Sequence, residues 1–183
     1  MSARFPVRPG ETVTAFALGP LSARPFAGTP APLEDRVDYR FVNGFVDVGD
    51  LPCRTATWDE VAARPVPPMP EVPDTDISLP GFNRRLDFSG FWHLPHRLAR
   101  GARTRLIPPG DGAAPFRLAT CGGVHVWVDG RHVAAFEPYR RNDVQEMALT
   151  LPLRPEGSEV VLLIEEMAER DTSYFVELTW AGE

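Results

Sequence analysis

The chain has 183 residues, a formal net charge of −6 and a hydrophobic content of 43%, which suffice for one full-sized folded domain and exclude wholesale disorder. Its 19 basic residues are all arginine, are outnumbered by 25 acidic residues and form no basic stripe, so we expect no nucleic-acid partner. No apolar run reaches the length of a membrane span or suits a signal peptide, so we expect a cytoplasmic protein with no membrane partner.

The N-terminal part predicts short elements joined by loops. Residues 12–18 and 37–48 have the alternation of strands, the second interrupted by an Asn-Gly turn or bulge, and the proline-rich stretch between them is expected to be a loop. Thr57 and Glu60 have the spacing of a capping box, which predicts a single turn of helix.

A proline-dense connector at residues 64–76 is expected to be extended and partly stiff. We place a boundary here, between an N-terminal arm (1–80) that packs on the main domain and the main domain itself (81–183). Cys53 and Cys121 lie one in each part without metal-ligand spacing, and two reduced thiols are favoured over a disulfide in a cytoplasmic protein.

From Leu86 onward the pattern is entirely that of strands. Residues 160–164 are apolar on both sides, which predicts a central strand covered on both faces. Eight short strands separated by turns predict a two-sheet sandwich or a barrel. The eight are residues 88–98, 104–107, 115–120, 124–128, 132–136, 146–153, 159–165 and 173–180.

The clearest single element is a hairpin around Asp129-Gly130, a pair that supplies the two positive-φ positions of a type I′ turn. This turn would pair Trp127 with His132 and Val126 with Val133, and it would place the valines on one face. The opposite face would then carry His125, Trp127, His132 and Ala134.

An ordered set of motifs accompanies this hairpin. It comprises Phe91-Trp92, Val-His-Val-Trp-Val-Asp-Gly-Arg at 124–131, Phe-Glu-Pro-Tyr at 136–139, and a glycine turn at 153–157 before the apolar run 160–164. The set resembles the galactose-binding-like jelly-roll domain, in particular the N-terminal sugar-binding domain of family 2 glycoside hydrolases. The resemblance covers roughly residues 86–180.

The resemblance implies an all-β jelly-roll β-sandwich with an irregular N-terminal arm. Asp129 replaces the family's usual asparagine and keeps its turn chemistry. The catalytic barrel that such domains precede is absent, so no catalytic residue is carried over. We therefore expect that this chain alone is not an enzyme; the resemblance implies an accessory domain, and the N-terminal fragment of a glycoside hydrolase is one form of it.

Trp127 is the first candidate for ligand contact, because a flat aromatic ring beside polar side chains is a platform for a sugar ring. His125 and His132 share its face, and Trp92 beside His93 has the same character. The alternative, which we favour, is that the N-terminal arm or a further partner domain covers this face and makes Trp127 a core residue.

The segment 137–143 holds further recognition-type residues. Its arginines can fork onto carboxylates or sugar hydroxyls, and its amide offers both donors and acceptors. An equally weighted alternative is a clasp in which an arginine neutralises the acidic segment 165–171. The candidates are Tyr139, Arg140, Arg141 and Asn142.

The histidines do not indicate a metal site. His93 and His96 are three apart, so on a strand they point to opposite faces. His125 and His132 lie diagonally on the hairpin, with Cβ atoms roughly 7 Å apart, and no carboxylate is placed beside them by the sequence. We expect no metal ion and no cofactor.

Three functions remain. The first is a carbohydrate-binding-like accessory domain, whose partner is a carbohydrate or an adjacent catalytic domain. The second is an interdomain or oligomerisation scaffold, with a homodimer as one form. The third and least favoured is a small cupin-like metal enzyme with inward-facing histidines.

Overall fold

A computed structural model of the chain describes residues 2–4, 9–13, 15–25, 40–42, 45–47, 66–73, 77–78, 85–110, 113–140 and 142–182. The regular elements in these ranges are all strands. Within them we find no helix with the length and apolar character needed to cross a membrane.

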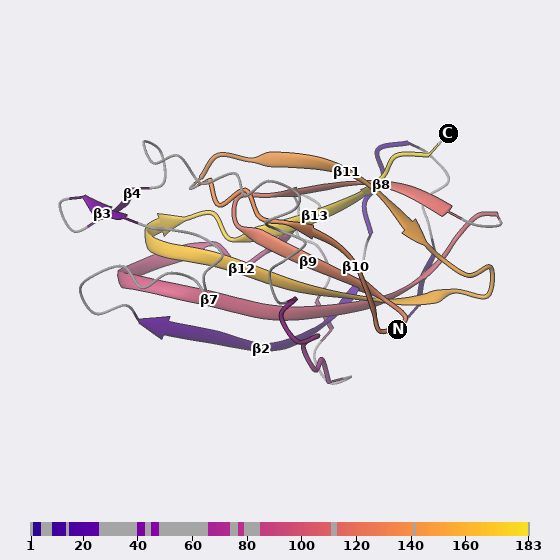
Figure 1. Ribbon diagram of the computed structural model, residues 1–183, viewed down its shortest axis with the longest axis horizontal. Coiled ribbons are helices and arrows are strands. Elements are labelled where there is room, and N and C mark those ends of the chain that lie inside the picture. Colours follow the sequence, from indigo (N-terminus) through magenta and orange to yellow (C-terminus); the bar gives the residue numbers. More distant parts are fainter. Residues whose placement is uncertain are drawn as a thin grey trace.

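The strands form two main sheets (Figure 1). Sheet A runs in the order β10 (Arg131–Phe136), β9 (Gly123–Val128), β12 (Ser158–Thr172), β7 (Gly90–Ile107), β2 (Phe16–Pro25) and β5 (Ile77–Ser78), with β1 (Ser2–Arg4) parallel to β7. Sheet B runs in the order β11 (Gln145–Pro152), β8 (Ala113–Thr120), β13 (Phe175–Trp180) and β6 (Leu86–Asp87). A separate antiparallel pair joins β3 (Arg40–Val42) and β4 (Phe45–Asp47).

The main core lies between the facing surfaces of the two sheets. Val126 of β9 and Leu162 of β12 meet Leu118 of β8 and Leu151 of β11 there, and all four are completely buried. The alternation of apolar residues along these strands places them on the inner face, as period-2 geometry requires. The predicted all-β sandwich is confirmed.

Strand β12 is central, between β9 and β7, and is covered on both faces as predicted. Val161, on its outer face, is only 2% exposed. The prediction that this strand ends at residue 165 is wrong, because pairing with β7 continues as far as Thr172. Strand β7 likewise spans the predicted break at residues 99–103, since the long ladder with β12 outweighs the weak strand propensity of Gly101.

The hairpin between β9 and β10 has the predicted turn, with positive φ of 48° at Asp129 and 80° at Gly130. The predicted pairing of Trp127 with His132 is confirmed. The predicted pairing of Val126 with Val133 is wrong, because a bulge between His132 and Ala134 shifts the register and pairs Val126 with Ala134. A bulge adds one residue to one strand and redirects the side chains around it.

The N-terminal segments contribute strands to sheet A. β2 pairs with β7 and begins at Phe16, whereas Thr12 makes an isolated bridge to Thr179. β2 also continues to Pro25, through a stretch predicted to be a loop, because a register shift between Leu18 and Leu21 accommodates the Gly19-Pro20 pair.

Residues 66–73, which we call the connector strip, lie against the outer face of sheet A. A Cβ atom added to Gly101 of β7 would come within 2.9 Å of Val72 Cγ2 and 3.0 Å of Pro70 Cβ, so the strip depends on the missing side chain. Val72 is buried in a second cluster that contains Ala17, Trp127 and Val161. The arm therefore covers Trp127, as the favoured alternative predicted.

Predictions for the N-terminal part that lie outside the described residues include the Asn-Gly turn at 43–44, the helical turn beginning at Thr57, and the state of Cys53. They stay predictions. Cys121 is described, and it is a buried free thiol.

Candidate functional site

A group of polar side chains lies on the outer face of sheet A, next to the cluster around Trp127. His125 of β9 stands opposite Leu163 of β12, and Gly123 stands opposite Glu165 two residues further along. His125 and Glu165 therefore project from the same side of adjacent strands. Their exposures are only 4% and 2%.

Two glycines allow other groups to approach this site. A Cβ atom at Gly122 would clash with the backbone oxygen of Glu165, so β12 can pass this close only to a glycine. A Cβ atom at Gly123 would lie 2.6 Å from Tyr139 Oη. The missing side chain lets the Tyr139 hydroxyl reach over β9 and donate to Glu165 Oε2 at 3.3 Å.

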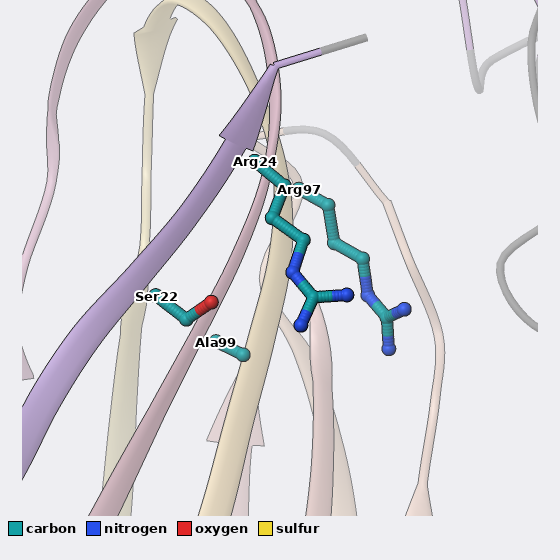
Figure 2. A pocket seen from close by; sticks show the side chains of 4 residues that line it. All are labelled: Ser22, Arg24, Arg97 and Ala99. Atoms are coloured by element: carbon teal, nitrogen blue, oxygen red, sulfur yellow. The ribbon is translucent and has the colours of Figure 1, made fainter.

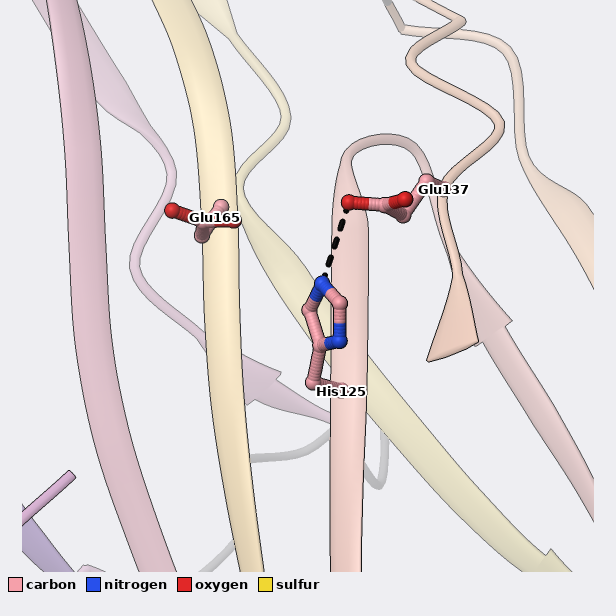
Figure 3. A group of neighbouring side chains, drawn as sticks. All are labelled: His125, Glu137 and Glu165. Atoms are coloured by element: carbon pink, nitrogen blue, oxygen red, sulfur yellow. Dashed lines mark hydrogen bonds and ion pairs between the residues drawn. The ribbon is translucent and has the colours of Figure 1, made fainter. Parts of the chain in front are cut away.

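His125 links a carboxylate to a second imidazole. Its Nε2 lies 3.0 Å from Glu137 Oε1, and its Nδ1 lies 3.1 Å from His132 Nε2. Figure 3 shows His125 rising from β9 toward Glu137, with Glu165 on the neighbouring strand. The contact between His125 and His132 was not predicted, because diagonal neighbours were expected to lie too far apart. A bulge in β10 lies directly after His132.

Glu165 is held from the other side by Arg97 of β7. The Arg97 guanidinium donates to Glu165 Oε1 at 2.6 Å, and both side chains are largely buried. A charge-assisted hydrogen bond of this length fixes the carboxylate strongly. Arg97 is thus the arginine that pairs with Glu165 among the described residues. The clasp alternative named Arg140 or Arg141, and because Arg141 lies outside the described residues, it stays a prediction.

His132 also lines an open groove of about 340 Å³, where the edge strands of the two sheets approach each other. We call this the β10–β11 groove. It combines a guanidinium, an imidazole and a hydroxyl with the apolar surfaces of a valine and a proline. Its lining residues are Arg131, His132, Val133, Thr150 and Pro152.

A second hollow of about 90 Å³ lies on the other side of Arg97, between β2 and β7. Figure 2 shows Arg24 and Arg97 extending side by side, and Ser22 and Ala99 also line the hollow. This hollow is smaller than the β10–β11 groove. Its Arg97 side chain also binds Glu165 already, which leaves fewer of its N–H groups to contact a ligand.

The aromatic candidates from the sequence are not open platforms. Trp127 is 4% exposed and Tyr139 is 1% exposed, so neither ring has a free face for a sugar. Trp92 is partly buried, packs against the main core and has its ring centroid 5.2 Å from that of His96. Trp127 instead supports the histidines, with ring centroids 5.1 Å from His132 and 5.9 Å from His125.

The segment after β10 acts mainly as a clasp. Asn142 donates from Nδ2 to the backbone oxygen of Asp171 at 3.0 Å and accepts from the Ser173 backbone N–H at 2.7 Å. The backbone N–H of Arg140 donates to the oxygen of Cys121 at 2.7 Å. Arg141 lies outside the described residues.

The electrostatics of the site favour a neutral imidazole at the groove. Burial lowers the pKa of His132, the neighbouring His125 lowers it further, and the Glu137 carboxylate opposes both effects. A neutral ring offers one donor nitrogen and one acceptor nitrogen, which suits hydroxyl ligands.

Sequence reasoning identified His125, His132 and Tyr139 but missed the acidic and basic groups that hold them. Glu137 directly follows β10 and belongs to the Phe-Glu-Pro-Tyr motif at 136–139, but its position in the sequence does not indicate a contact with His125. Arg97 and Glu165 are 68 positions apart, and only the pairing of β7 with β12 brings them together.

The comparisons with known proteins assign no family. No protein-family model matches the chain, and neither does any curated protein. Among solved structures, the chain is similar to a family 35 carbohydrate binding module from Clostridium thermocellum, with 11% identity over 52% of this chain and 87% of that module. The TM-score is 0.31, a likeness too weak to carry an argument, so the sandwich fold rests on the strand pairing described above.

Proposed function

We propose that this chain is a non-catalytic carbohydrate-binding accessory domain that binds a sugar unit in the β10–β11 groove. The supporting observation is the lining of that groove, where Arg131, His132 and Thr150 stand around the apolar surfaces of Val133 and Pro152. A sugar presents hydroxyl groups at its rim and C–H groups on its faces, so it needs both kinds of surface together.

The groove has suitable size and partial rigidity for this role. A volume of about 340 Å³ is at the small end of the range for small-ligand sites, which suits one or two sugar rings. His132 is held by His125, and the Trp127 ring packs against it. A donor that is already oriented loses less entropy on binding.

The finer parts of the proposal are that the ligand-binding domain serves a larger glycoside hydrolase, and that it works in the cytoplasm. They rest on the sequence motifs that resemble the sugar-binding domain of family 2 enzymes. They add no catalytic residue to this chain.

Calorimetric titration with a panel of neutral and acidic mono- and oligosaccharides tests the proposal. Replacement of Arg131 by alanine should weaken binding about tenfold, as expected for one charged hydrogen bond worth about 1.4 kcal/mol. Arg24→Ala is the matched control, because Arg24 is an exposed arginine on β2, which β9, β12 and β7 separate from β10 in sheet A. No heat with any sugar, or equal affinity in the two variants, would contradict the proposal.

A scaffold function is the second candidate, and one exposed residue favours it. Phe91, in β7, is 55% exposed, with its ring centroid 4.9 Å from that of His93. Light scattering of the chain and of Phe91→Ser tests this alternative. A dimer that Phe91→Ser dissociates would favour the scaffold, whereas a monomer in both samples would remove the homodimer.

A further inference from the structure

Three metal-ligand groups converge at the candidate site from three different segments. They are His125 of β9, Glu137 just after β10 and Glu165 of β12, and one donor atom from each lies within 4.8 Å of the other two. His125 and Glu165 are almost completely buried, and Glu137 is partly buried. The group therefore differs from a cluster of exposed acidic side chains.

We propose that His125, Glu137 and Glu165 bind a divalent first-row transition ion of the Zn²⁺ class. One imidazole nitrogen with two carboxylate oxygens is a donor set that such ions accept, with a further position left for water. The nitrogen donor disfavours Ca²⁺ and Mg²⁺, which prefer oxygen ligands. The metal proposal does not rest on the sugar proposed for the β10–β11 groove, although His132 contacts the ligand His125 and also lines that groove.

The spacing requires only a small contraction around the ion. Two donors bound at about 2.1 Å from one ion lie roughly 3.0–4.2 Å apart. His125 Nε2 and Glu137 Oε1 are already 3.0 Å apart. Glu137 follows the end of β10 and is only partly buried, so its side chain can supply the remaining movement.

Two of the three ligands are already oriented by other groups. The second nitrogen of His125 faces His132 Nε2 at 3.1 Å, and the second oxygen of Glu165 accepts from Arg97 at 2.6 Å. Metal-ligating histidines almost always donate their other N–H to a neighbouring acceptor, which fixes the ring. The ion would then bind His125 Nε2, which now contacts Glu137, and Glu165 Oε2, which now accepts from the Tyr139 hydroxyl, so it would replace both contacts.

Metal binding at this site predicts a specific proton rearrangement. Without metal, the Glu137 carboxylate can only accept, so a neutral His125 ring would donate from Nε2 and accept at Nδ1 from His132. An ion at His125 Nε2 requires the proton on Nδ1, which then donates to His132 Nε2. Each neutral ring keeps one proton, so both tautomers change and no proton is lost from the pair.

The test is titration of the full chain, after treatment with a chelator, with Zn²⁺ alone. We expect one equivalent of Zn²⁺ to bind and to raise the melting temperature, and we expect Ca²⁺ and Mg²⁺ at the same concentration to have no effect. Nitrogen NMR of ¹⁵N-histidine protein should show His125 and His132 changing tautomer together. The absence of Zn²⁺ binding would overturn the proposal.

Variants separate this site from adventitious binding at other histidines. Glu137→Gln, at the least buried ligand, should weaken Zn²⁺ binding at least tenfold, a loss comparable to those seen when groups around a metal are removed. His93→Gln is the control, because His93 is an exposed histidine on β7. His125→Gln should abolish both binding and the tautomer change. Equal Zn²⁺ affinity in Glu137→Gln and His93→Gln, with both variants folded, would overturn the proposal.

Discussion

The two faces of sheet A are both buried, but they are buried by different kinds of structure. The inner face packs against sheet B, and residues such as Val126 and Leu162 are completely inaccessible there. The outer face is covered by the connector strip, which buries Trp127 and Val161 in a smaller cluster. On the outer face, the buried polar residues His125 and Glu165 lie where this cluster ends, whereas Thr104 and Glu166 are buried on the inner side.

This difference relates burial to function. Charged groups are rare between two packed sheets, because each buried charge needs a partner. A covering strip of eight described residues leaves part of the outer face for other uses. The paired groups Arg97–Glu165 and Glu137–His125 occupy that part, and His132 connects it to the β10–β11 groove.

The largest expected effect contrasts two adjacent leucines of β12. Leu162 is completely buried on the inner face, whereas Leu163 is only partly buried on the outer face. Leu162→Ala should lower the free energy of unfolding by about 3 kcal/mol, and Leu163→Ala by about 1 kcal/mol. Urea denaturation of both variants measures the difference. Equal losses would show that the connector strip buries its face as effectively as sheet B.

A second prediction loosens the outer cover alone. The Cβ atom of Gly101→Ala would press on Val72 and Pro70, which should cost about 1–2 kcal/mol and partly displace the connector strip. Trp127 would then become more accessible, so acrylamide should quench the tryptophan fluorescence more strongly. Gly110→Ala is the control, since no atom lies within 4 Å of its added Cβ. Unchanged quenching in Gly101→Ala would mean that the strip does not cover Trp127.

The inner face could be predicted from the sequence because it follows from local patterns. The alternating valines of β9 predicted the buried side, and Asp129-Gly130 predicted the turn. Both depend on residues that are neighbours along the chain. Backbone geometry then decides which side chains point inward.

The outer face could not be predicted to the same extent, because long-range contacts form it. The connector strip has no periodic pattern, and its position depends on the space above Gly101. The bulge at Val133 leaves no signal in composition, yet it accompanies the His125–His132 contact. The sequence therefore identified several of the site's side chains and favoured the burial of Trp127, but it did not identify the partners of His125.

A smaller loss of stability is expected at the hairpin turn between β9 and β10, which neither sheet B nor the connector strip covers. Gly130 has a φ of 80°, a conformation that costs an L-amino acid about 1 kcal/mol, although no atom lies within 4 Å of an added Cβ. Gly130→Ala should therefore lower the free energy of unfolding by that amount without changing the quenching of Trp127. A loss above about 3 kcal/mol would contradict this prediction and would show that the stability of sheet A depends on this turn more than its local contacts imply.

The smallest effect concerns Cys121, which is buried at the corner between β8 and β9. Burial, with a further contribution from the Glu166 carboxylate, raises the pKa of its thiol from 9.0 to about 11. The thiol therefore stays protonated and should resist iodoacetamide at pH 8 in native protein but react readily in denaturant, as measured by mass spectrometry in a Cys53→Ser background.

The same pKa shift fixes the sign of a pH effect and provides a final comparison of the two faces. Because the pKa is higher in the folded state, the stabilising contribution of the thiol is complete below pH 9 and is lost as the pH rises toward 11. If the two faces are independent, Gly101→Ala should expose Trp127 and leave the alkylation rate of Cys121 unchanged. A faster rate would mean that loosening the outer strip also opens the inner corner, so that sheet A responds as one cooperative unit.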